Sequence, residues 1–231
     1  MDFETTFISF FNSASSSDTS LLGGKGSNLV HLTQNQFHVP PGFIIITAAL
    51  DTSINYSLEQ NRTTDGEGYV LEIDPQVLSF IEMSLELLQK QQDGLLAVRS
   101  SGAKEDGAAF SYAGLYETFL EIDFNVESVV SAVVKCWLSA LDDRVKKYQS
   151  GWDSDVGADD IELLRDSKVA VVVQLMVDAN AAGVGFTADP VTHSLDHVVI
   201  EAVSGLGESL VSGQRTPDQY KYSKDTGELT K

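Results

Sequence analysis

The sequence predicts an α+β chain folded as two lobes, with a strand-rich second half. Residues 75–92 carry a helical stripe of apolar side chains. Short apolar runs typical of strands follow one another between residues 169 and 222. The first half mixes both kinds of element without an internal repeat, which favours α+β over a single regular architecture. We expect one lobe over residues 1–95 and a second over 96–231.

In the first half, small polar residues predict a loop over 13–20, and the spacing of residues 27–32 suits a short helix. A Pro-Pro-Gly turn at 40–42 leads into a strand over 43–47. Residues 51–74 are polar and predict irregular structure. The helix over 75–92 begins at Pro75, a residue favoured in the first helical turn.

Beyond residue 95, strands are expected over 95–98 and 116–122, separated by a Gly/Ala-rich stretch. The longest helical stripe covers 126–148, and an acidic loop follows over 153–160. Residues 171–176 and 183–190 suggest a hairpin. Further strands are predicted over 197–202 and 219–222, and a helix after the glycine-rich turn at 205–207.

The charge balance limits the ligands that the chain can hold. The 231 residues include 34 acidic and 15 basic side chains, a formal net charge of −19. Nucleic acids are bound by clustered lysine and arginine, and no such cluster occurs, so a nucleic-acid partner is not expected. With 42% apolar residues, the chain is expected to be globular.

The longest purely apolar runs, such as residues 169–173, are too short to span a membrane. The first residues are acidic and predict no secretory signal, so a cytoplasmic protein is expected. Cys136, the single cysteine, excludes an internal disulfide and is predicted to lie in the core. The four histidines lack zinc-ligand spacing, so no metal ligands are assigned.

The segment Gly23-Gly24-Lys25-Gly26 could bind phosphate. Glycines let the backbone approach an anion, the following helix offers N–H groups, and Lys25 adds a positive charge. The spacing is not that of a Walker A motif. The alternative is a glycine turn entering a helix, with Lys25 in solvent.

Arg99 follows a short apolar run in Val98-Arg99-Ser100-Ser101. We expect it at the end of a strand, where its guanidinium could hold phosphate oxygens in a bidentate manner. The alternative is a surface pair with Glu105 or Asp106.

Three further segments leave similar alternatives open. Residues 105–114 have the composition of a flexible lid, and equally of an ordinary loop. Gln174 interrupts an apolar strand, so its amide needs a partner, either a nucleotide or a neighbouring backbone group. The glycine-rich turn at 205–207 could offer N–H groups to phosphate, although it lacks the third glycine of a dinucleotide fingerprint.

The order of these motifs is more specific than any one of them. Gly-Gly-Lys-Gly is followed by Val-Pro-Pro-Gly-Phe, Val-Arg-Ser-Ser, Gln-x-Met, Phe-Thr-Ala-Asp-Pro and Gly-Leu-Gly-Glu-x-Leu-Val-Ser-Gly. This series resembles the N-terminal nucleotide-binding domain of phosphoenolpyruvate synthase, pyruvate phosphate dikinase and rifampicin phosphotransferase. The resemblance covers residues 21–222.

The resemblance implies an ATP-grasp fold that clamps Mg-ATP between two lobes and passes its β-phosphoryl group to a histidine on a separate domain. Its implied cofactors are ATP and Mg²⁺, and its implied partners are phosphohistidine and acceptor-binding domains. The implied site residues fall into two groups. Lys25 and Arg99 would bind phosphate and serve catalysis, whereas the nucleotide would also meet Gly114, Thr118, Gln174 and Met176.

The sequence departs from the family pattern in several places. Ala103 replaces a threonine, and Leu115 replaces the glutamine expected after Ala-Gly. The later Asp-Ile-Glu-Trp, Gln-x-Arg-Pro and Thr-x-Gly-Gly motifs are missing, so we expect a C-terminally truncated domain with an incomplete second lobe. The leading hypothesis is the ATP-binding domain of a dikinase-type phosphotransferase. The alternatives are a degenerate binding or regulatory module and an ATP-dependent enzyme of specialised metabolism with another acceptor.

Overall fold

The computed structural model describes residues 6–15, 17–60, 71–103, 117–141 and 160–231. These residues form helices and two antiparallel sheets, so the predicted α+β class is confirmed. The chain divides into two compact units, Met1–Met176 and Val177–Lys231. The predicted lobe boundary between residues 95 and 96 falls inside the first of these units, and it stays a prediction about nucleotide-binding lobes.

The first unit is built around a five-stranded sheet with β5 (Val169–Leu175) at its centre. The strand order is β1 (Ile8–Phe10), β2 (Gly42–Ile45), β5, β3 (Leu96–Gly102) and β4 (Thr118–Ile122). All neighbouring strands are antiparallel. Every residue of β5 is buried, so both faces of the sheet must be covered.

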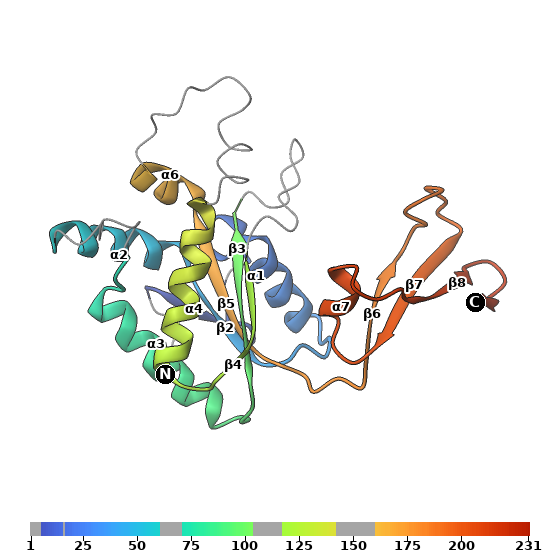
Figure 1. The fold of residues 1–231 in the computed structure, drawn as a ribbon, viewed down its shortest axis with the longest axis horizontal. Coiled ribbons are helices and arrows are strands. Elements are labelled where there is room, and N and C mark those ends of the chain that lie inside the picture. Colours follow the sequence, from blue (N-terminus) through green and yellow to red (C-terminus); the bar gives the residue numbers. More distant parts are fainter. Residues whose placement is uncertain (1–5, 16, 61–70, 104–116, 142–159) are drawn as a thin grey trace, which may run out of the picture. The chain divides into compact units, whose positions relative to one another are not determined.

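Helices provide this cover, as Figure 1 shows. On one face, α2 (Thr47–Glu59), α3 (Pro75–Gln89) and α4 (Val126–Leu138) form the larger core with Val98, Val171 and Val173. On the other face, α1 (Thr19–Gln34) packs its Leu22 and Val30 against a smaller apolar cluster from β2 and β5. The two faces therefore have separate cores, because alternate residues of each strand point to opposite sides.

The stripes predicted over 75–92 and 126–148 both begin helices. The Asp74 side chain accepts hydrogen bonds from the N–H groups of Gln76 and Val77, and Pro75 takes the first helical position. α4 ends at Leu138 and continues as a short 3₁₀ turn, η1 (Ser139–Leu141). The remainder of that predicted helix, residues 142–148, lies outside the described residues.

The expectation of irregular structure from residue 51 is wrong for residues 51–59, which belong to α2. The buried face of α2 includes Ser53 and Ser57 beside Leu50 and Ile54. Their hydroxyl groups bond the backbone of residues 72 and 74, so serines can occupy a core face. A search for apolar spacing misses such a helix. Apolar spacing likewise does not predict β1 or α6 (Asp160–Ser167), and α1 is longer than the helix predicted over residues 27–32.

The predicted hairpin between residues 171–176 and 183–190 is also wrong. β5 pairs with β2 and β3, whereas β6 (Ala181–Phe186) pairs with β7 (His197–Ser204) in the second unit. β5 is buried on both faces and takes both partners from strands distant in sequence. Adjacency along the chain therefore gave the wrong pairing.

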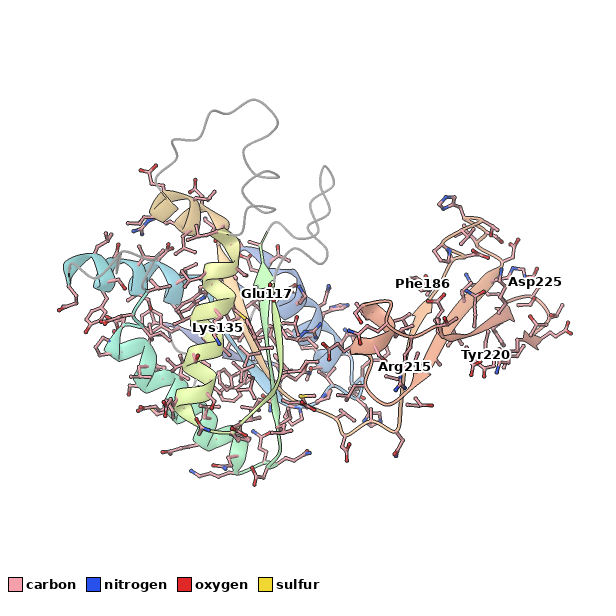
Figure 2. All side chains as sticks on the ribbon, in the orientation of Figure 1. Glu117, Lys135, Phe186, Arg215, Tyr220 and Asp225 are labelled. Carbon is pink, nitrogen blue, oxygen red and sulfur yellow. The ribbon has the colours of Figure 1, made fainter. Side chains whose placement is uncertain are left out.

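The second unit confirms the strand-rich second half. Its antiparallel sheet has the order β6, β7, β8 (Asp218–Ser223) and β9 (Leu229–Thr230). The short helix α7 (Glu208–Val211) follows Gly205 and Gly207, as the glycine-rich turn predicted. Figure 2 shows Phe186 on β6, Arg215 beyond α7 and Tyr220 on β8.

The packing of α3 allows a prediction about the stability of two variants. Ile81 is 0% exposed and Met83, two residues along the same helix, is 42% exposed. We expect Ile81→Ala to lower the free energy of unfolding by about 2–5 kcal/mol, because it leaves a cavity in the larger core. Met83→Ala should change it by less than about 0.5 kcal/mol. Urea denaturation followed by tryptophan fluorescence, to which the buried Trp137 contributes, measures both. Equal losses would contradict this assignment of the core.

Candidate functional site

Two of the predicted site residues are direct neighbours on one face of the first sheet. Arg99 on β3 lies opposite Thr118 on β4 and Val172 on β5. Val172 belongs to the cluster beneath α1, whereas the next residues, Val98 and Phe119, pack on the other side. Arg99 and Thr118 therefore lie on the α1 face. Gln174, two residues beyond Val172 along β5, shares this face.

Arg99 is the middle residue of a seven-residue strand, so its predicted place at a strand end is wrong. The strand continues because Ser100 and Ser101 satisfy their hydroxyl groups with backbone partners and can be fully buried. Arg99 itself is half-buried, and its buried Nε has no hydrogen-bond partner among the residues that the structure describes. A buried donor without a partner is costly, and such donors are rare in folded proteins. The alternative partners Glu105 and Asp106 lie outside the described residues.

Lys25 lies on α1, which packs over the same face of the sheet. The helix is interrupted at Gly23, whose φ of 69° and ψ of 172° are not helical, and it resumes at Gly24. A positive end of a helical segment therefore lies at Gly24-Lys25-Gly26. The predicted turn into a helix is thus present as a kink inside a longer helix, and Lys25 is half-buried there.

Ser101 joins the Gly23–Gly26 segment to β3. Its hydroxyl donates to the carbonyl oxygen of Leu22 at 2.9 Å and accepts from the N–H of Gly26 at 3.0 Å. A Cβ added at Gly23 would overlap the carbonyl oxygen and Oγ of Ser101. The motif Val98-Arg99-Ser100-Ser101 predicts two serine hydroxyl donors, but nothing in the sequence indicates that Ser101 bonds the Gly23–Gly26 segment.

Of the two partners predicted for the Gln174 amide, a nucleotide or a backbone group, the structure shows a backbone group. Its Nε2 donates to the carbonyl oxygen of Pro40 at 3.0 Å, and its side chain is buried. Met176, just after β5, donates its N–H to Leu95, and its Sδ accepts from the N–H of Glu121 at 3.0 Å. Glu121 has a φ of 55°, at the irregular end of the β3–β4 pairing. These bonds fix the backbone around the end of β5.

The remaining predicted site residue is outside the described part of the chain. Gly114 lies there, together with Leu115 and the rest of the expected lid over 105–114. Thr118 is the first residue of β4 and is exposed. The structure therefore brings Arg99, Thr118 and Gln174 to one sheet face beneath α1.

Cys136 lies in the larger core, as predicted. Burial raises the pKa of its thiol to about 12, and the Glu117 carboxylate adds to this effect. The thiol is therefore protonated at neutral pH and cannot serve as a nucleophile. Within the described ranges, no group of three His, Cys, Asp or Glu side chains is placed to hold a metal ion. Over the same residues, every helix is too short or too polar to cross a membrane.

Asp189, in Phe-Thr-Ala-Asp-Pro, fixes the turn after β6. Its carboxylate accepts hydrogen bonds from Lys221 Nζ at 2.8 Å and from the N–H groups of Val191 and Thr192. These donors, Lys221 foremost, hold the pKa of Asp189 well below its usual range. Only 4% of the residue is exposed. Asp189 therefore has a structural role in the second unit.

Together, these features define a class of protein: an α+β domain in which a glycine–lysine segment at the start of a helix and a partly buried arginine lie on the same face of a sheet. Residues 70–231 match the family described as pyruvate phosphate dikinase, AMP/ATP-binding domain. The match covers more than half of the chain. The chain therefore belongs to this family, and it is an ATP-binding domain of the type found in phosphoenolpyruvate synthase-like phosphotransferases.

The chain is also similar to parts of several longer proteins, which carry different names. A prodigiosin synthesizing transferase of Serratia marcescens is 38% identical over 213 residues, covering 90% of this chain and 23% of its own length. A probable phosphoenolpyruvate synthase of Methanothermobacter thermautotrophicus is 36% identical over 249 residues, with coverages of 96% and 35%. The rifampicin phosphotransferase of Bacillus cereus is 30% identical over 243 residues, with coverages of 96% and 27%. The chain spans a third or less of most of these relatives.

The Asp189 contacts predict a pH-dependent stability. The lowered pKa means that Asp189 stabilises the fold above the pKa of an unfolded aspartate, about 4, and that this contribution is lost as the pH falls further. We expect Asp189→Asn to lower the thermal midpoint at pH 7, with the difference from the wild type shrinking toward pH 3. Thermal unfolding at both pH values measures it.

Asp218→Asn is the matched control for Asp189→Asn. Asp218 pairs with Lys231 at 2.7 Å, but both side chains are largely exposed, so its loss should matter little. If Asp189→Asn lowered the thermal midpoint equally at pH 3 and pH 7, the result would contradict a stabilising role for the Asp189 charge.

Proposed function

We propose that this domain binds Mg-ATP and delivers its β-phosphoryl group to a histidine on a separate domain, as part of a dikinase-type phosphotransferase. The observation that carries the proposal is the buried Nε of Arg99, on the face covered by α1, which has no hydrogen-bond partner in the described part of the chain. A phosphate oxygen would satisfy this donor, because guanidinium groups form strong charge-assisted hydrogen bonds with phosphate. The glycine–lysine segment of α1 adds a cation and a helix start on the same side.

In this proposal, Lys25 and Arg99 bind the phosphates and are the catalytic residues. Transfer of a phosphoryl group depends on fixed cations and N–H donors around the developing charge more than on a protein nucleophile. Thr118, next to Arg99, contacts the polyphosphate, and Gly114 belongs to the covering loop. Gln174 and Met176 lie near the adenine. The two lobes, divided near residues 95 and 96, clamp the nucleotide in an ATP-grasp-like manner.

Mg²⁺ enters this proposal with the nucleotide. Mg²⁺ usually keeps several waters and is held by one or two carboxylates plus substrate phosphates. When bound, the ion would neutralise charge on the phosphates, while Lys25 and Arg99 fix their position.

We propose that the acceptor of the phosphoryl group is bound by other parts of the longer proteins. The relatives are named for phosphoenolpyruvate, rifampicin and prodigiosin, yet all share this region. We propose that the phosphohistidine and acceptor-binding domains lie outside this region and that the protein acts in the cytoplasm. The shared region would then supply the nucleotide chemistry, whichever acceptor is used.

Substitution of the two cations tests the site. Lys25→Ala and Arg99→Ala should each weaken Mg-ATP binding by about 1.5–3 kcal/mol, because each removes a charge-assisted hydrogen bond. Isothermal titration measures the affinity. Lys90→Ala and Arg165→Ala are the controls: Lys90 is exposed after α3, and Arg165 bonds Asn55 and Asp51. Unchanged affinity in both Lys25→Ala and Arg99→Ala would reject the site.

Two other functions have specific support. Ala103 and Leu115 depart from the family pattern, which favours a non-catalytic nucleotide-binding or regulatory module. The similarity to a prodigiosin synthesizing transferase favours an ATP-dependent enzyme of specialised metabolism. Mass spectrometry after incubation with ATP and candidate acceptors separates them. Release of phosphate or AMP indicates an enzyme, whereas intact ATP in every mixture indicates a module.

A further inference from the structure

Ser101 lies two residues beyond Arg99 on β3, so the two side chains share the α1 face of the sheet. The residue is 0% exposed, and its hydroxyl makes one bond as a donor and one as an acceptor. Both partners, Leu22 and Gly26, flank the interruption of α1 at Gly23. One side chain therefore fastens both sides of the Gly23–Gly26 segment to the strand that carries Arg99.

The fit around this contact is close. Gly23 needs its positive φ and has no room for a Cβ against Ser101. Gly26 sits against Ile44 and Leu22, where an added Cβ would lie 3.1 Å and 3.3 Å from their carbon atoms. The backbone on either side of Lys25 is thus held directly on the sheet. Glycines at 23, 24 and 26 would otherwise leave this segment many conformations.

We infer that Ser101 is a positioning residue, whose hydroxyl fixes Lys25 relative to Arg99 so that both cations meet one polyphosphate chain. The inference rests on the proposed function and adds a residue to it. It follows from geometry: Lys25 stands between Gly24 and Gly26, and the N–H of Gly26 is bound to a side chain from the strand of Arg99. Preorganised charges bind an anion better than mobile ones, because they lose less freedom on binding.

Ser100 provides a matched control. It is also 0% exposed, and its hydroxyl donates to a backbone carbonyl at 2.9 Å, that of Glu117. Figure 2 labels Glu117 beside the start of β4. Ser100 points to the face opposite Arg99 and does not bond the Gly23–Gly26 segment. Its loss should affect folding stability much as that of Ser101 does, without affecting Lys25.

The experiment compares Mg-ATP affinity by isothermal titration in Ser101→Ala, Ser100→Ala and the wild type. We expect Ser101→Ala to weaken binding about tenfold, because the Gly23–Gly26 segment would then lose conformational freedom when ATP binds, and this loss costs affinity. Ser100→Ala should change it less than about twofold. Ser101→Cys leaves no cavity, since cysteine is slightly larger than serine, and it has a weaker hydrogen-bonding group, so it should also weaken binding selectively.

A double-mutant cycle with Lys25→Ala separates positioning from general destabilisation. If Ser101 acts through Lys25, adding Ser101→Ala to Lys25→Ala should lower ATP affinity little further. Two results would overturn the inference while leaving the nucleotide site intact. In one, Ser101→Ala weakens ATP binding equally in the wild type and in Lys25→Ala. In the other, Ser100→Ala and Ser101→Ala weaken ATP binding equally. A wild-type chain that does not bind Mg-ATP would instead refute the proposed function, and this inference with it.

Discussion

The complete burial of β5 is the constraint on which the first unit depends. All seven residues of this strand are buried, and both of its neighbours, β2 and β3, come from distant parts of the sequence. A central strand without an exposed face requires cover on both sides. The chain provides it unequally: among the described residues, α2, α3, α4 and α6 contribute to the larger core on one side, and α1 with a small cluster lies on the other. The thinner side carries Arg99, Ser101 and Gln174.

Polar groups inside such a sheet must find partners, and the way they do so distinguishes Arg99 from its neighbours. Ser101 bonds Leu22 and Gly26, and Gln174 bonds Pro40, so both are satisfied within the fold. The Nε of Arg99 has no such partner within the described ranges of the chain. Bonds within the fold therefore account for the serine and the glutamine, whereas in the proposed function a phosphate oxygen would be the partner of Arg99.

The sequence predicted the parts of the fold that depend on local patterns. The helix at Pro75 was found because its buried positions are apolar, whereas α2 was missed because Ser53 and Ser57 fill part of its buried face. Strand pairing was not predictable, because the partners of β5 are set by burial and distant contacts. Arg99 was placed at a strand end because its apolar run stops there, yet β3 continues through buried serines. Motif order indicated Lys25, Arg99, Thr118 and Gln174, but only the sheet register shows that the last three share one face.

A net charge of −19 is unfavourable for an anionic ligand at long range, so binding of ATP would depend on short-range contacts. Exposed charges farther away than the Debye length, about 8 Å at physiological salt, are largely screened. Cations that touch the phosphates act below this distance, and their effect is strongest when they are partly buried and held in place. The half-buried Lys25 and Arg99, on segments joined through Ser101, meet both conditions. Affinity in such a domain would therefore depend on how firmly two cations are held together more than on its overall charge.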